Sequence, residues 1–171
     1  MYKYIIGIDP SGNFHEGKGT TGCCVFSATA DAVLSTCSIH STNYLCQEDY
    51  WKAIIEFIFK NYMKHPNSVV VIEDYLLYAD KAKSQINSKM ETPKLIGVLQ
   101  YYCYQCDIPV VFQTASQVKT RWADNILQYK GYIKKHNRTF IIPKIGKPID
   151  RHAKDAIRHA VHYNTFKNKE V

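Results

Sequence analysis

Strand-like and helical hydrophobic patterns follow one another along the chain in an order that limits the possible folds. Three segments rich in β-branched and aromatic residues come first, at 2–9, 20–27 and 32–40, and short connections join them. Residues 47–65 then carry apolar side chains at three- and four-residue steps and end before Pro66, which predicts an amphipathic helix. The chain therefore begins as an antiparallel meander followed by a helix.

The second half of the chain alternates between short strands and helices. The apolar runs 69–72 and 108–112 predict buried strands, and residues 92–106, 115–130 and 150–166 predict helices. Thr92 is the expected N-cap of the first of these helices, and Asp150 lies near the N-terminus of the last, where a carboxylate is favoured. Residues 79–91 and 131–149 are predicted to be polar or basic loops.

This order of elements, β-β-β-α-β-α-β-α, predicts an α/β fold. We expect a mixed five-stranded sheet, made of an antiparallel meander plus parallel strands and flanked by helices. A chain of 171 residues that is 46% hydrophobic and 22% charged fits one globular domain, 1–171, and excludes a disordered chain. No stretch has the length of a membrane span, and the first residues lack the layout of a secretory signal. We therefore expect a cytoplasmic protein with no membrane partner.

The six cysteines do not have the spacing of a disulfide framework. Cys23 and Cys24 are neighbours in a predicted strand, and Cys103 and Cys106 lie in a predicted helix. The second pair is also half of a possible zinc site, but no further pair follows at a suitable spacing. Packing roles are favoured for all of them.

Positive charge is concentrated in the last third of the chain. The net charge is +7, and eleven of the 22 Lys and Arg residues lie within residues 119–158, together with three acids. This distribution predicts a polyanionic partner, although a solvated basic face has the same charge pattern.

Three acidic residues stand at positions where a fold of this kind binds ligands. Asp9 and Glu73 each end an apolar strand, and His152 and Asp155 share one face of the last helix at a three-residue spacing. Asp9 alone is equally compatible with an ordinary turn acid, and Glu73 alone with a solvated residue at the end of a strand. Together, converging carboxylates would be stabilised by a divalent cation, and hard oxygen ligands favour Mg²⁺ or Mn²⁺ over zinc.

Several motifs then resemble those of one family, in the right order over most of the chain. They are IIGIDPS at 5–11, the Gly-Thr-Thr-Gly run at 19–22, VVVIEDY at 69–75, the segment 96–122 and RHAKDAIRHAV at 151–161. They resemble the RuvC-type Holliday-junction resolvases of the RNase H-like superfamily, particularly the divergent phage-type members. Between residues 121 and 150 the glycine-containing basic turn usual in cellular members is replaced by a basic, aromatic passage.

The resemblance implies an RNase H-like fold and hydrolysis of phosphodiester bonds with two metal ions. Asp9 would bridge two Mg²⁺ ions, Glu73 would hold one and Asp155 the other, and Mn²⁺ would substitute for Mg²⁺. His152 matches a position that is His or Asp in the family, and it would either bind metal or position the phosphate. The implied activity is that of a magnesium-dependent crossover junction endodeoxyribonuclease.

The implied partners are branched DNA and a second copy of the chain. DNA contacts are expected at Lys119, Arg121, Tyr75, Tyr78, Lys81 and Lys83, where the two tyrosines would stack on unpaired bases. Two symmetric nicks in a four-way junction imply a homodimer. The helix at 92–106 is a candidate dimer surface, because its tyrosines 101, 102 and 104 exceed what one apolar face needs.

Three other functions compete with this interpretation. Another RNase H-like nuclease, one that cuts RNA–DNA hybrids or flaps, would have the same metal site. An actin-like ATPase would need two lobes around its nucleotide, and 171 residues are too few. A non-catalytic basic nucleic-acid-binding protein explains the charge but gives no reason for three carboxylates facing a polyanion.

Overall fold

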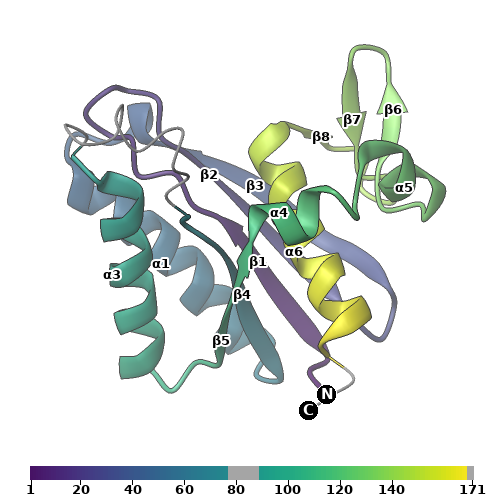
Figure 1. The fold of residues 1–171 in the computed structure, drawn as a ribbon, viewed down its shortest axis with the longest axis horizontal. Helices are drawn as coiled ribbons and strands as arrows, with labels where there is room; N and C mark the ends of the chain where they lie inside the picture. Colours follow the sequence, from purple (N-terminus) through teal and green to yellow (C-terminus); the bar gives the residue numbers. More distant parts are fainter. Residues whose placement is uncertain (77–88, 169–171) are drawn as a thin grey trace.

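A computed structural model describes residues 1–76 and 89–168, and its centre is a five-stranded sheet in the order β3-β2-β1-β4-β5 (Figure 1). Strands β1 (Tyr4–Asp9), β2 (Thr20–Ser27) and β3 (Ala32–His40) form an antiparallel meander. Strands β4 (Ser68–Asp74) and β5 (Val110–Thr114) add to β1 in parallel. The predicted mixed five-stranded sheet is confirmed.

Helices cover both faces of this sheet (Figure 1). Helix α1 (Gln47–Lys64), reached through the short helix η1 (Ser41–Asn43), packs with α3 (Glu91–Gln105) on one face. Helix α6 (Arg151–Phe166) crosses the other face and contacts β1 and β2 most extensively. No helix in the described ranges is long and apolar enough to cross a membrane.

The two-residue period of the strands divides the core between these faces. In β1, Ile5 packs on the α6 side, whereas Ile6 and Ile8 pack on the side of α1 and α3, and all three are fully buried. Burial of each such side chain contributes about 1.5–3 kcal/mol. The alternation continues past Ile8, so Asp9 at the end of β1 faces α6.

Two glycines let α6 lie unusually close to the sheet. A Cβ atom at Gly7 would overlap the carbonyl oxygen of Ala156, and one at Gly22 would overlap that of His152. Gly22 pairs with Asp9 across β1 and β2. The first turn of α6 is therefore held directly over the end of β1, and the Asp150 side chain caps it by accepting a 2.8 Å hydrogen bond from the Ala153 N–H.

The prediction of one helix over residues 115–130 is wrong. The segment forms two short helices, α4 (Ala115–Lys119) and α5 (Asp124–Tyr129). Ala123 has a non-helical backbone between them, and the Trp122 carbonyl accepts a 2.8 Å hydrogen bond from Nε of Arg158. Tertiary contacts with α6 therefore replace the helical hydrogen bonds at this point.

Residues 131–149 also differ from the prediction, because they are not only loop. They contain a second, three-stranded sheet of β6 (Lys134–His136), β7 (Thr139–Ile141) and β8 (Pro148–Ile149), which projects beyond the main sheet together with α5 (Figure 1). Ile133, Ile142 and Ile149 anchor it to the α6 side of the core. Strands of two or three residues are too short to show a period.

The N-cap predicted at Thr92 is likewise wrong. Helix α3 begins at Glu91, after Met90 in a left-handed conformation. The Thr92 hydroxyl instead accepts a 3.0 Å hydrogen bond from the Gly12 N–H, so it holds the loop that follows β1. All six cysteines lie within the described residues as free thiols, and Cys103 is buried in the face of α3 that packs on the sheet.

Candidate active site

The structure brings the three predicted acids together where β1 and β4 end beneath α6. Asp9 is 6% exposed and Asp155 is 2% exposed. The Lys119 ammonium nitrogen lies 3.2 Å from Glu73 Oε2 and also 3.2 Å from Asp155 Oδ2. His152 completes the group, because its Nδ1 lies 2.8 Å from Asp9 Oδ2. Residues from two strands and two helices therefore meet at one point.

Asp9 is held in an environment that opposes its charge. Burial raises the pKa of Asp9 from 3.8 to about 6, the hydrogen bond from His152 opposes this rise, and the negative charges of Glu73 and Asp155 add to it. The same hydrogen bond raises the pKa of His152. This crowding of negative charge is what a bound cation would relieve.

Glu73 is held as a carboxylate by two partners. Burial alone would raise its pKa, but the hydrogen bond and charge of His159, together with Lys119, lower the pKa of Glu73 from 4.5 to about 2. His159 is fully buried, with Nε2 at 2.8 Å from Glu73 Oε2 and Nδ1 at 3.1 Å from Gln113 Oε1. His159 is not among the site residues predicted from the sequence. Its four-residue spacing from Asp155 was the available signal, since it puts both side chains on one face of α6.

Asp155 is anchored by a residue that the sequence analysis also missed. The guanidinium of Arg158 bonds to Asp155 through Nη1 and to Asp124 of α5 through Nη2. Lys154 adds a 2.7 Å bond to the same Asp124 carboxylate. Asp155 therefore has a fixed position relative to α5 as well as to the sheet.

Lys119 is the cation that contacts both Glu73 and Asp155. Burial favours its neutral form, but Asp155, Glu73 and Asp9 outweigh burial and raise the pKa of Lys119. Its side chain is 35% exposed, so the ammonium group neutralises the buried acids from the solvent edge of the site. The sequence predicts Lys119 as a DNA contact, whereas the structure places it against the acids themselves.

The three carboxylates suit a divalent cation. In this structure, however, Lys119 and Arg158 supply the positive charges that face them. Within the described ranges, no three acidic, histidine or cysteine side chains are close enough to hold an ion as they stand. Glu73 and Asp155 instead share one ammonium group. Carboxylate oxygens facing a common cation fit Mg²⁺ or Mn²⁺ chemically. Binding of such an ion between them requires Lys119 to withdraw.

Replacing Asp9 with Asn should stabilise the metal-free protein at neutral pH. Because the folded-state pKa of Asp9 is raised to about 6, its ionisation costs stability progressively from about pH 4 to pH 6. The cost is about 2–3 kcal/mol above that range, from about 1.4 kcal/mol per pKa unit. Urea unfolding in EDTA should therefore show Asp9→Asn more stable than the natural protein at pH 7 and equal to it near pH 4. A less stable variant at pH 7 would refute this electrostatic account.

The other residues predicted to contact DNA are spread more widely. Arg121 stacks over the ring of Phe166, at 5.0 Å from its centroid, near the C-terminal end of α6 and away from the acids. Tyr75 is half-buried and packs against the apolar cluster beneath α1 and α3. Tyr78, Lys81 and Lys83 lie outside the described residues. Among the three predicted DNA contacts that the structure describes, Lys119 is the one brought to the site.

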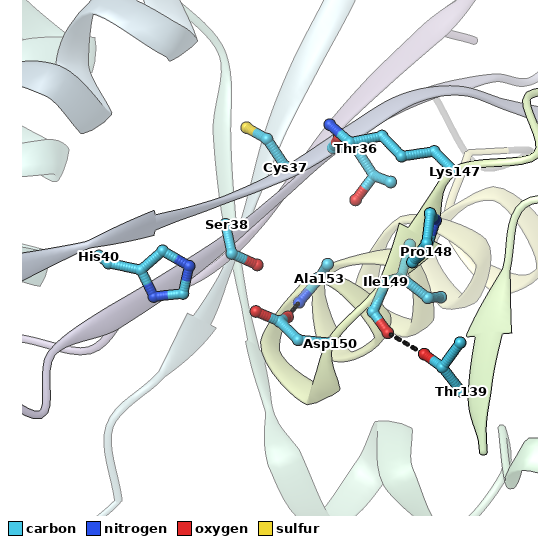
Figure 2. Close-up of a pocket in the computed structure, with 10 residues that line it drawn as sticks. All are labelled: Thr36, Cys37, Ser38, His40, Thr139, Lys147, Pro148, Ile149, Asp150 and Ala153. Atoms are coloured by element: carbon cyan, nitrogen blue, oxygen red, sulfur yellow. Dashed lines mark hydrogen bonds between the residues drawn. The ribbon is translucent and has the colours of Figure 1, made fainter.

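An open groove of about 480 Å³ lies beside the first turn of α6 (Figure 2). Its walls are β3, the end of the small sheet and the start of α6, and Lys147 bonds across it to the Thr36 carbonyl oxygen at 3.0 Å. Asp150 and Ala153, which border it, flank His152 in the sequence. The groove therefore borders the first turn of α6, the turn that also carries His152.

Comparison with known proteins gives likenesses at the level of structure. No protein-family model matches the sequence, and no curated protein matches it either. Among solved structures, T. thermophilus RuvC in complex with a Holliday junction substrate matches with a TM-score of 0.70 and 14% identity, over 98% of this chain and 96% of that chain. Another Thermus thermophilus RuvC structure matches over the same shares with a TM-score of 0.68 and 14% identity.

Proposed function

We propose that this chain, which has the RuvC-type RNase H-like fold, is a divalent-metal-dependent endonuclease that cuts branched DNA, with the four-way junction as its substrate. The observation that carries the proposal is the meeting of Asp9, Glu73 and Asp155 beneath α6, where one ammonium group contacts two of them. A buried group of acids is costly unless cations neutralise it, and we propose that a divalent metal takes the place that Lys119 holds between Glu73 and Asp155. Residues 1–171 would act as one nuclease domain.

Each residue of the site has a defined task in this proposal. Asp9, Glu73 and Asp155 would hold Mg²⁺, with Mn²⁺ as a substitute. When bound, two such ions would supply the positive charge that activates a water molecule and stabilises the leaving 3′ oxygen. His152 donates to Asp9 and orients its carboxylate, and Arg158 fixes Asp155 in the same way.

Lys119 and the groove would serve the DNA strand. The Lys119 ammonium is at the solvent edge of the acids, within reach of a phosphate that enters the site. Lys147 and His40 line the groove beside the first turn of α6 (Figure 2), and we place the nucleic-acid backbone on that side. In this arrangement the strand would approach along the groove, and the scissile phosphate would meet the acids next to Lys119.

Two arguments support a four-way DNA junction as the substrate: the likeness of the fold to RuvC, and the two cuts that resolve such a junction. The matched RuvC structure contains a Holliday junction substrate. A four-way junction has two equivalent strands to cut, so we propose that two copies of this chain act together. The outer face of α3 is the proposed contact between them, because Tyr101 and Tyr104 are 65% and 75% exposed there. Exposed aromatic side chains of this size are typical of interfaces.

Cleavage of matched synthetic substrates tests the proposal. A four-way junction, a flap, an RNA–DNA hybrid and a linear duplex of the same sequence are each incubated with Mg²⁺, with Mn²⁺ and with EDTA. We expect symmetric cuts in the junction with either metal and none with EDTA. Cleavage that persists in EDTA would refute the metal site. Equal cleavage of every substrate would leave a nuclease but remove the junction as its target, and preference for the hybrid would favour the RNase H-like alternative.

A further inference from the structure

We propose that His159 is a positioning residue, which fixes the Glu73 carboxylate through Oε2 and so leaves Oε1 as the oxygen that faces a cation. The inference rests on the proposed function, because it assumes that Glu73 is a metal ligand. His159 is fully buried in α6. Among the described residues, it makes no hydrogen bond or ion pair with Asp9 or Asp155.

His159 bonds to side chains from two neighbouring strands. Glu73 and Gln113 are paired in the register of β4 and β5, so their side chains lie next to one another on the face that α6 covers. His159 is fully buried above this pair and uses one ring nitrogen on each. A buried imidazole is costly unless its polar atoms have partners, and here both ring nitrogens have one.

The proton arrangement of the three side chains favours donation to Glu73. Since an ionised carboxylate only accepts hydrogen bonds, the Nε2 of His159 carries the hydrogen that points to Glu73 Oε2. On the other side, the buried Nε2 atom of Gln113 has no hydrogen-bond partner among the residues that the structure describes. If the Gln113 amide is turned by 180°, its Nε2 donates to Nδ1 of a neutral His159 imidazole. In the orientation that the structure has, Gln113 Oε1 accepts from Nδ1 of an imidazolium. Donation to Glu73 is the same in both cases.

The bond from His159 restricts the orientation of the Glu73 carboxylate. Lys119 lies at 3.2 Å from Oε2 and 3.3 Å from Oε1, so this cation does not select one oxygen over the other. His159 does, because its 2.8 Å bond is made to Oε2 alone. Loss of a partner that orients a metal ligand typically weakens metal binding or activity by roughly 10–100-fold. His159 should therefore affect metal affinity without touching the metal.

Two variants that differ by one methylene group test the proposal. In His159→Gln the amide nitrogen has the reach of the imidazole Nε2 and still donates to Glu73, whereas in His159→Asn the side chain is too short. His162→Asn is the matched control, because His162 is on the same helix and accepts a 3.3 Å bond from Trp122 Nε1, with no contact to the three acids. Circular dichroism and thermal unfolding establish that each variant is folded.

The primary readout is calorimetric binding of Mn²⁺ to the DNA-free protein. We expect His159→Asn to weaken binding by roughly 10–100-fold, and His159→Gln and His162→Asn to stay within about threefold of the natural protein. The Mg²⁺ concentration for half-maximal junction cleavage should rise in parallel for His159→Asn, with a smaller change in kcat at saturating Mg²⁺. A residue that only stabilised the fold would not change the half-maximal Mg²⁺ concentration more than kcat.

Other outcomes overturn the inference in distinguishable ways. Unchanged Mn²⁺ affinity in His159→Asn, with normal metal-dependent cleavage by the natural protein, would leave the proposed function standing and make His159 a packing residue. Equal weakening in the Gln and Asn variants would show that the donor to Glu73 is not what matters. If His159→Asn does not fold, His159→Gln decides alone, and a tenfold loss of affinity in it refutes the proposal. A natural protein that neither binds Mn²⁺ nor cuts DNA would remove both proposals together.

Discussion

Asp9→Asn should reduce the rate of four-way junction cleavage by about 10³-fold or more while leaving junction binding unchanged. Asn keeps the size of the side chain and an oxygen that can accept the hydrogen bond from His152, so the site should keep its shape. It removes the negative charge that a divalent cation needs. DNA affinity depends mainly on the basic surface and should be retained.

Single-turnover cleavage and filter binding at one salt concentration measure the two effects separately. Glu48→Gln is a suitable control, because Glu48 is an exposed acid in the first turn of α1, on the opposite face of the sheet. It should change neither quantity. Cleavage by Asp9→Asn at more than one tenth of the natural rate would contradict the assignment of Asp9 as a metal ligand.

Gly22→Ala should destabilise the protein by roughly 3 kcal/mol, near the upper end of the usual cost of overpacking. The added methyl group would overlap the His152 carbonyl, which belongs to backbone and cannot rotate away. Helix α6 would have to move off β2, which loosens the core and separates His152 from Asp9. Metal-dependent cleavage should fall along with the stability.

Gly97→Ala provides the matched comparison for this effect. Gly97 is exposed in α3, and a Cβ atom there would meet nothing within 4 Å. Alanine should therefore stabilise the helix by about 0.5–1 kcal/mol. Urea unfolding of both variants in EDTA gives the two free energies. If Gly22→Ala is as stable as the natural protein, α6 is not held as closely against the sheet as described.

The main sheet and the three acids were predictable because their signals are local. β1 and β4 are continuous apolar runs, and each ends in an acid, so the strand ends and the side chains placed there are visible in the sequence. The helical period of residues 150–166 likewise defines which face of α6 carries Asp155. Parallel strands place their carboxyl ends together, which brings Asp9 and Glu73 to one edge.

The parts that were not predictable depend on contacts between distant residues. His159 is 86 positions from Glu73, and its role depends on the register between β4 and β5, which no local pattern encodes. Thr92 has the side chain of an N-cap, but Gly12, 80 positions away, uses its hydroxyl. In the small sheet, strands of two or three residues are held by burial of their flanking isoleucines rather than by their own pattern.

Crystals of the protein soaked in Mn²⁺, with diffraction data collected at the manganese absorption edge, test the central claim most directly. We expect anomalous density in direct coordination with Asp9, Glu73 and Asp155, and the Lys119 ammonium displaced from between the latter two. Anomalous density elsewhere on the chain, with Lys119 still bonded to Glu73 and Asp155 at high Mn²⁺ concentration, would contradict it.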